Sequence, residues 1–218
     1  MVFKINGDIV SDEYADIYDY FEIPCTSPKK VSEALSSLPK GDRLEVKINS
    51  GGGMVMAGQE IYSTLRGRKD VDIEVESIAA SAASLIAMAG HSTISPAGLI
   101  MIHDVSMSTS GNKNELKKDV KTLETFDEAL ASAYAAKTGK SQEEILSLMD
   151  KETWLPAAKA VELGFIDAIS EDPAVMTASI GQNLQVTPDM VARYKAAKEE
   201  KEKEKADIIA DLDSYGRA

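Results

Sequence analysis

Two strand-then-helix units follow each other in the first half of the chain, and this order constrains the fold more than any other feature. In the first unit, residues 43–48 alternate apolar and polar side chains as a half-exposed strand does. Asn49 ends that strand, and after a run of glycines residues 54–65 show a helical apolar period. In the second unit, residues 71–75 predict a strand and residues 79–89 a helix rich in small side chains. Tandem units of this kind pair their strands in parallel, so the sequence predicts an α/β fold.

The neighbouring segments carry further strand and helix signals. We expect a short strand broken by a glycine turn at 2–10, a strand at 96–102, amphipathic helices at 30–38 and 113–137, and a short helix at 157–163 ended by Gly164. Ser141 with Glu144 three residues later is a capping pair that begins one more helix.

The compact pattern stops after Ile169. Thr187-Pro188-Asp189 is a helix start signal, and the Lys/Glu-rich block that follows has almost no apolar face, so it cannot form a core by itself. We therefore expect a compact domain over residues 1–170, a linker over 171–187 and a charged helical tail over 188–218.

Charge and composition exclude several classes of function. The chain has 24 Lys and Arg against 36 Asp and Glu, a formal charge of −12, which repels nucleic-acid phosphates and anionic membranes. The longest apolar run, at 78–89, is shorter than the roughly 18 residues a membrane span needs, and the N-terminus turns polar before a signal-type stretch forms. We expect a cytoplasmic protein. The single cysteine excludes an internal disulfide and a cysteine-clustered metal site, and we expect neither metal nor cofactor.

Three features carry chemistry when they are taken together. The glycine loop at 49–53 lets another backbone approach closely, and it is not a phosphate loop, because Met-Val-Met follows it. Ser81 lies where a strand passes into a helix, a place where serines are most often caps. His103 ends an apolar strand, where a lone histidine is most often structural.

The order of these features resembles the Clp serine peptidase family (ClpP). The resemblance covers roughly residues 44–170 and is carried by I-N-S-G-G-G at 48–53, A-G at 57–58, I-Y at 61–62, A-A-S at 79–81, A-G at 89–90, M-I-H at 101–103 and T-W-L-P-A-A-K-A-V-E-L-G-F-I-D at 153–167. It implies a ClpP/crotonase-like fold of repeated β-β-α units with a protruding handle helix and a C-terminal helical tail. It also implies that Ser81 is the nucleophile, His103 the general base, and Gly53 and Ala82 the donors of an oxyanion hole.

The third catalytic residue implied by the resemblance is Glu152, two residues before the aromatic Trp154. The family has Asp there, and a carboxylate one methylene longer can still hold the imidazole tautomer. Asp150 is the alternative. Asp104 adjoins His103, but neighbours on a strand point to opposite faces, so it should not orient the ring.

The sequence contains one alternative to Ser81 and one to His103. Ser84 follows Ser81 by three residues on one helical face and is interpreted as a packing residue. His91 is interpreted as a surface loop residue.

The subfamily that the chain resembles is the prophage-encoded head maturation (prohead) proteases, because the first strand begins at about residue 2 and a charged tail is added. We expect an ATP-independent endopeptidase that cleaves phage scaffold and capsid proteins. We do not expect an AAA+ unfoldase partner, because a first strand that begins at about residue 2 does not predict the pore-lining extension of housekeeping members. A heptamer-type homo-oligomeric ring is implied, with the apolar stripe of residues 113–137 as its interface.

Two alternatives stay open. A crotonase-type acyl-CoA enzyme would share the fold and a glycine-loop oxyanion hole, although its chemistry usually needs Glu or Asp near the active loop. A catalytically vestigial assembly protein is the other alternative.

Overall fold

The computed structural model describes the backbone of residues 1–170 and 186–215, and the side chains of residues 1–170 and 186–203. Its strands are β1 (Val2–Ile9), β2 (Cys25–Thr26), β3 (Leu44–Gly53), β4 (Val71–Ala80), β5 (Ser92–Ile94), β6 (Leu99–Ile102), β7 (Thr153–Pro156) and β8 (Ala168–Ile169). Its helices are α1 (Asp12–Tyr20), α2 (Pro28–Ser36), α3 (Val55–Leu65), α4 (Ala82–Ala87), α5 (Lys113–Thr138), α6 (Gln142–Asp150), α7 (Ala157–Glu162) and α8 (Pro188–Tyr215).

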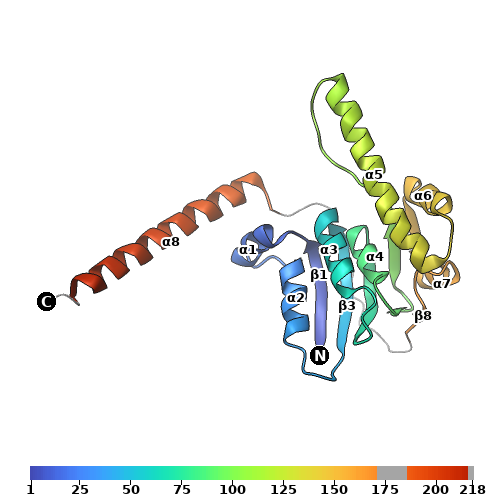
Figure 1. Ribbon diagram of the computed structural model, residues 1–218, viewed down its shortest axis with the longest axis horizontal. Helices are drawn as coiled ribbons and strands as arrows, with labels where there is room; N and C mark the ends of the chain where they lie inside the picture. The colour runs from blue at the N-terminus through green and yellow to red at the C-terminus, as the bar shows by residue number, and fades with distance from the viewer. Residues whose placement is uncertain (171–185, 216–218) are drawn as a thin grey trace.

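One sheet organises the molecule. Its strands are parallel along the path β2-β1-β3-β4-β5-β8. The end of β4 also pairs in parallel with β6, and β7 lies antiparallel on β6. The helices α2, α3 and α4 lie side by side along the sheet, whereas α5 projects beyond it (Figure 1). The predicted α/β fold with parallel strands is confirmed.

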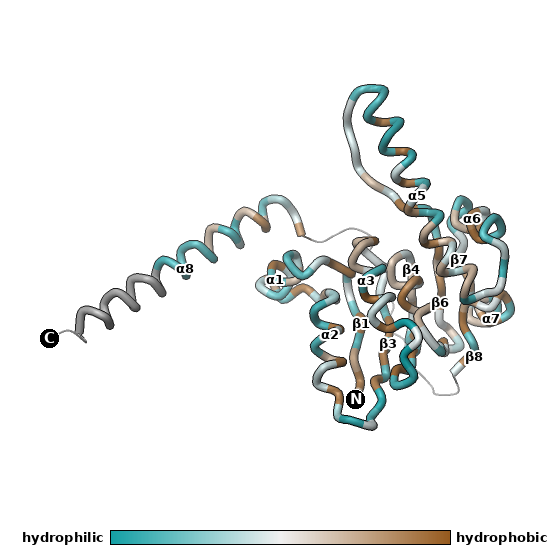
Figure 2. The backbone as a smooth tube through the Cα atoms, in the orientation of Figure 1, coloured by the Kyte–Doolittle hydropathy of each residue, from teal (hydrophilic) through white to brown (hydrophobic). Residues whose placement is uncertain are grey.

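The core lies between the sheet and these helices. Val46 and Val75 of the two central strands, Ile61 of α3 and Leu85 of α4 are among its buried side chains. Burying a side chain of this size stabilises the fold by about 1.5–3 kcal/mol. Figure 2 shows hydrophobic residues along the strands, while the projecting end of α5 is largely hydrophilic.

Both central strands are longer than predicted. β3 does not end at Asn49 but continues to Gly53, because the glycines pair with Asp8 and Ile9 of β1. β4 likewise continues to Ala80, because its last residues pair with β6, and α4 begins only after Ser81. The predicted helix at 79–89 was wrong at its start: alanines favour helix, but pairing with a distant strand decides the local structure.

The N-terminal region also differs from the prediction. β1 is one strand with a register shift between Asn6 and Asp8, not a strand broken by a turn, because a bulge at Gly7 keeps it paired with β3. The periodicity did not predict α1, and it missed β5, whose three residues are too few for a pattern.

The helices with cap signals match the prediction closely. α5 begins after the N-cap Asn112, which forms a capping box with Glu115, and it ends at the left-handed Gly139. α6 begins after Ser141, whose predicted capping box with Glu144 is present.

The inner end of α5 is attached to the rest of the molecule through Lys137. Its ammonium donates to the Gly90 carbonyl oxygen at 2.8 Å and to the Asp167 carboxylate at 2.6 Å. These bonds fix the inner end of α5 to the sheet.

The tail helix α8 starts as predicted, with the Met190 N–H donating to the Thr187 hydroxyl at 3.3 Å. Its first turns contact α1 and the residue after it. The Tyr194 ring lies 5.5 Å from that of Tyr20, and the Arg193 guanidinium 5.9 Å from the Phe21 ring. The apolar residues near the end of the tail, Ile208, Ile209 and Leu212, are the ones its sequence offers for docking, and their side chains lie outside the described residues.

Candidate active site

Ser81 occupies a strained junction between β4 and α4. Its φ of 54° and ψ of −125° lie outside the regions that residues with a side chain prefer. Its N–H donates to the Met101 carbonyl oxygen of β6 at 2.9 Å, which ties the junction to the neighbouring strand. Although Ser81 is the N-cap residue of α4, its side chain makes no capping hydrogen bond. The hydroxyl is therefore available for another contact.

That contact is with His103, the residue directly after β6. The His103 Nε2 lies 2.8 Å from the Ser81 Oγ. Because β6 pairs with the end of β4, the sheet brings together two residues that are 22 positions apart in the sequence. A neutral imidazole in this position can accept the hydroxyl proton while Oγ attacks a carbonyl carbon.

The glycines of β3 allow its backbone to approach this junction. A Cβ on Gly52 would lie 2.7 Å from the Ala80 carbonyl oxygen and 2.8 Å from the Ser81 Cβ. A Cβ on Gly53 would instead overlap the Ile9 carbonyl oxygen of β1. Both glycines also have positive φ. Ala82 is the first residue of α4, so its N–H has no partner within the helix.

Two cavities meet at Ser81 and His103. One of about 60 Å³ is lined by both polar and apolar groups, with Leu85, Leu130 and the Tyr134 ring among the apolar ones. The other, of about 360 Å³, is a more open groove lined by Asp8, Gly52, Met54 and Met101. Gly53 lines both cavities. The arrangement provides an open groove and a small cavity on either side of the Ser81 hydroxyl.

The Glu152 side chain is not bonded to His103 among the described residues; both residues lie just beyond the paired ends of β6 and β7. Ile102 of β6 pairs with Thr153 of β7, and this is the last pair of the ladder. Glu152 directly precedes it in a turn, with a φ of 48°. The exposed Glu152 carboxylate instead accepts a hydrogen bond from the Trp154 indole at 3.1 Å. Within residues 1–170 and 186–203, no hydrogen bond or ion pair joins the two side chains.

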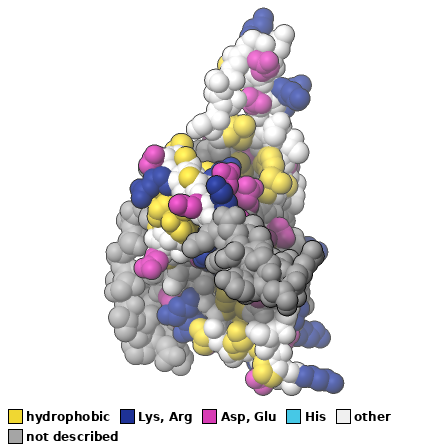
Figure 3. Space-filling view, turned by 90° about the vertical axis from the view of Figure 1, so that its left-hand side faces the viewer, with side chains coloured by type: hydrophobic (Ala, Val, Ile, Leu, Met, Phe, Trp, Pro, Cys, Tyr) yellow, Lys and Arg dark blue, Asp and Glu magenta, His cyan; other side chains and the backbone are white. Residues whose placement is uncertain are grey.

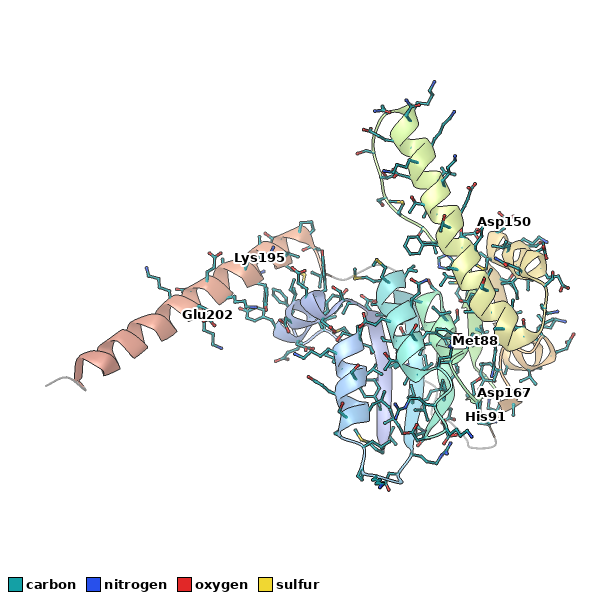
Figure 4. All side chains as sticks on the ribbon, in the orientation of Figure 1. Met88, His91, Asp150, Asp167, Lys195 and Glu202 are labelled. Atoms are coloured by element: carbon teal, nitrogen blue, oxygen red, sulfur yellow. The ribbon has the colours of Figure 1, made fainter. Side chains whose placement is uncertain are left out.

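The alternative carboxylates also make no hydrogen bond to His103 in the described part of the chain. Asp150 is the last residue of α6 and is exposed at its end (Figure 4). Asp104 lines the 60 Å³ cavity together with His103. The argument from alternating strand faces does not apply to this pair, because β6 ends at Ile102. Burial and the charges of Asp127 and Asp150 raise the pKa of the Asp104 carboxyl, against the lowering effect of His103.

The remaining polar residues behave as the sequence predicts. Ser84 is buried and donates to the Ser81 carbonyl oxygen at 2.7 Å, with the Tyr134 hydroxyl at 2.8 Å. Burial raises the pKa of Tyr134 to about 12, so its hydroxyl stays neutral and the pair serves packing. His91 is exposed in the loop before β5, near Asp167 and on the side of the molecule away from the projecting end of α5 (Figure 4).

Sequence reasoning missed Asp127 of α5, whose Oδ1 accepts the Val105 N–H at 2.7 Å, two residues after His103. The sequence signal was weak, because Asp127 is one charge among many on a helix that the pattern presents as solvated. Only the position of α5 beside the segment that follows β6 distinguishes it from the others.

Comparison with known proteins decides the family. A profile of the family described as Clp protease matches residues 14–173, which include Ser81, His103 and Glu152. The chain belongs to the Clp protease family. Two proteins named ATP-dependent Clp protease proteolytic subunit, from two strains of Bacteroides fragilis, are each 29% identical to it over 139 residues. The alignments cover 62% of this chain and 67% and 63% of those relatives.

Membership in the Clp protease family implies a serine peptidase and agrees with the mixed α/β fold with its parallel sheet. The family match does not favour the crotonase-type alternative. No helix in the described stretches combines the length and apolar character needed to cross a bilayer.

Proposed function

We propose that this chain is a serine endopeptidase of ClpP type, with Ser81 as nucleophile and His103 as general base. The observation that carries the proposal is the 2.8 Å contact between the Ser81 Oγ and the His103 Nε2 at a strained strand-to-helix junction. The cavities on either side of this contact supply room for a peptide.

In the first half of the reaction, the Ser81 Oγ attacks the peptide carbonyl carbon and its proton passes to the His103 Nε2. The backbone N–H groups of Gly53 and Ala82 are the proposed donors to the oxyanion, and one such donor contributes roughly 3 kcal/mol to lowering the barrier. The imidazolium then gives its proton to the leaving amine as the C–N bond breaks. Water hydrolyses the resulting ester with His103 again as base, which restores the Ser81 hydroxyl.

Glu152 is the proposed third member, with Asp150 as the alternative. Glu152 and His103 each adjoin the last pair of the β6–β7 ladder, Ile102 with Thr153, and turning the Glu152 side chain away from Trp154 would free its carboxylate for another partner. A carboxylate beside the ring would hold the imidazole tautomer and stabilise the imidazolium.

We expect Glu152→Gln to lower kcat by about tenfold or more and Asp150→Asn to leave it near the wild-type value. Equal effects of the two substitutions would contradict the choice of Glu152.

The finer role that we propose is cleavage of phage scaffold and capsid proteins during head maturation, in the host cytoplasm and without an ATP-driven unfoldase. A homo-oligomeric, heptamer-type ring is part of this proposal. Support comes from the resemblance to prohead proteases and from α8, a charged helix beyond the residues that the family profile matches.

A fluorophosphonate probe on the purified protein tests the chemistry. We expect labelling in the wild type, its complete loss in Ser81→Ala and its retention in the matched control Ser84→Ala, because a methyl group cannot replace a nucleophile. Retained labelling in Ser81→Ala would refute the assignment. A wild type that neither labels nor hydrolyses peptides would favour the vestigial assembly protein.

The phage role needs a separate experiment. Co-expression with the scaffold and capsid proteins of a candidate phage, without any added ATPase, should yield discrete cleavage products from the wild type and none from Ser81→Ala. Cleavage that requires an AAA+ ATPase and ATP would contradict the proposed independence from an unfoldase.

A further inference from the structure

The position of the His103 ring depends on what holds the chain after it. β6 ends at Ile102, and residues 103–112 have no regular structure before α5 begins at Lys113. The Val105 N–H, two residues beyond His103, donates to the Asp127 Oδ1 of α5 at 2.7 Å. A second bond lies farther along the same segment, where the Thr109 hydroxyl donates to the Asp119 Oδ2 at 2.6 Å. α5 therefore holds this segment at two points, one of them next to the ring.

Charge adds to the effect of the first bond. Burial raises the pKa of the Asp127 carboxyl, and the charge of Glu124 on the same helix raises it further. The Val105 N–H and the charge of His103 lower this pKa, and the net direction is upward. Asp127 is thus electrostatically coupled to the imidazole from the α5 side. Among the other carboxylates, Asp104 lines the cavity with His103, the charge of Asp150 acts on Asp104, and Glu152 directly precedes β7.

We propose that Asp127 is a positioning residue for His103: its carboxylate holds the Val105 N–H, fixes the segment that carries the imidazole against α5, and presents a negative charge towards the ring. This inference rests on the proposed roles of Ser81 and His103. In the acylation step the ring becomes an imidazolium, which a nearby negative charge stabilises. The hydrogen bond keeps Nε2 within reach of Oγ, and small displacements of reacting groups cost large factors in rate.

A simple loop attachment would explain the hydrogen bond without any role for charge, and two substitutions separate these interpretations. Asp127→Asn keeps an oxygen that can accept the Val105 N–H but removes the charge. Asp127→Ala removes both. Asp119→Asn is the matched control, because Asp119 lies on the same helix and bonds the same segment away from the ring.

The experiment measures the rate of Ser81 labelling by a fluorophosphonate, kcat and KM on a peptide, and the pH profile of kcat/KM. We expect Asp127→Ala to lower the labelling rate and kcat by about tenfold with little change in KM. Asp127→Asn should give a smaller loss and move the acid limb of the profile to lower pH, because the ring loses a neighbouring negative charge. Asp119→Asn should match the wild type in all three measurements.

Exchange of the Val105 amide with solvent, followed by NMR, tests the attachment independently of activity. It should become at least about tenfold faster in Asp127→Ala, because the bonded amide is freed, and stay unchanged in Asp119→Asn. Wild-type exchange in Asp127→Ala, or wild-type rates and pH profile in both Asp127 variants, would overturn the inference while Ser81-dependent labelling keeps the proposed function. Absence of labelling in the wild type would instead overturn the proposed function, and the amide exchange would still decide whether Asp127 holds the segment.

Discussion

The two halves of α5 carry the same apolar period in different surroundings. In the inner half, Leu130, Ala131 and Tyr134 are buried against the core, and Tyr134 lines the cavity beside Ser81. In the outer half, Leu116 and Val120 are 40% and 54% exposed. That half projects from the molecule and carries charged side chains of both signs around its apolar ones (Figure 3). An amphipathic period therefore identifies a face to be covered but not what covers it.

The largest effect is expected in the inner half. Tyr134→Ala should lower the free energy of unfolding by about 3–5 kcal/mol, because it leaves a cavity in the core. Tyr134→Phe keeps the ring and removes only the bond to Ser84, whose hydroxyl still donates to the Ser81 carbonyl oxygen, so we expect a loss of about 1 kcal/mol. Urea denaturation measures both. Equal losses would mean that the hydroxyl, not the ring, dominates at this position.

The outer half should respond in assembly and not in stability. Leu116→Asp with Val120→Asp should change the free energy of unfolding of the isolated subunit by less than about 0.5 kcal/mol, since both side chains are exposed. If this face is the proposed ring interface, light scattering should show an oligomer for the wild type and none for the double variant. The reason is that assembly of the variant would bury two unpaired carboxylates at the interface. Lys117→Ala on the same half is the control. A wild-type monomer at micromolar concentration would refute the interface.

A smaller effect is expected where α5 meets the sheet. Burial raises the pKa of the Asp167 carboxyl, but the Lys137 ammonium, the Ser92 N–H and the His91 charge outweigh it, and the net pKa is lowered. A carboxyl whose pKa is lower in the folded protein than in the unfolded chain stabilises the fold at pH values above the unfolded pKa. This stabilisation is lost as the pH falls through the folded pKa. Asp167→Asn should therefore weaken the acid dependence of stability below about pH 4 and cost about 1 kcal/mol or less at pH 7. An unchanged dependence would show that Asp167 is not its source.

The features of α5 that could be predicted from the sequence are local. Asn112, Glu115 and Gly139 mark its ends, and its length makes the period clear. The extents of β3 and β4 could not be predicted, because Gly53 and Ala80 owe their strand conformation to partners on β1 and β6. Local patterns contain no information about such pairings.

In the candidate site, too, some residues could be predicted from the sequence and others could not. Ser81 and His103 were found through a resemblance that covers their motifs, and the structure then sets them 2.8 Å apart. Asp127 had no motif, and only the placement of α5 beside the segment after β6 brings it to Val105. The hydrogen bond between Glu152 and Trp154 depends on the side-chain conformation of Glu152, which the spacing of the two residues does not determine.

The smallest effect on chemistry is expected from removing the tail. A chain of residues 1–170 keeps the Ser170 N–H bond to the Ile94 carbonyl oxygen at 2.8 Å, and it loses the contacts of Arg193 and Tyr194 with the segment after α1. These contacts lie on elements other than those that carry Ser81 and His103, and an exposed charged helix contributes little stability of its own. Fluorophosphonate labelling of Ser81 should therefore proceed at the wild-type rate, whereas the size of the assembly or the binding of a scaffold protein should change. Tyr194→Ala in the full chain separates the two causes, because it removes the aromatic contact and leaves the charged helix in place. If the shortened chain fails to fold or to label, the tail is part of the catalytic domain and the boundary at residue 170 is wrong.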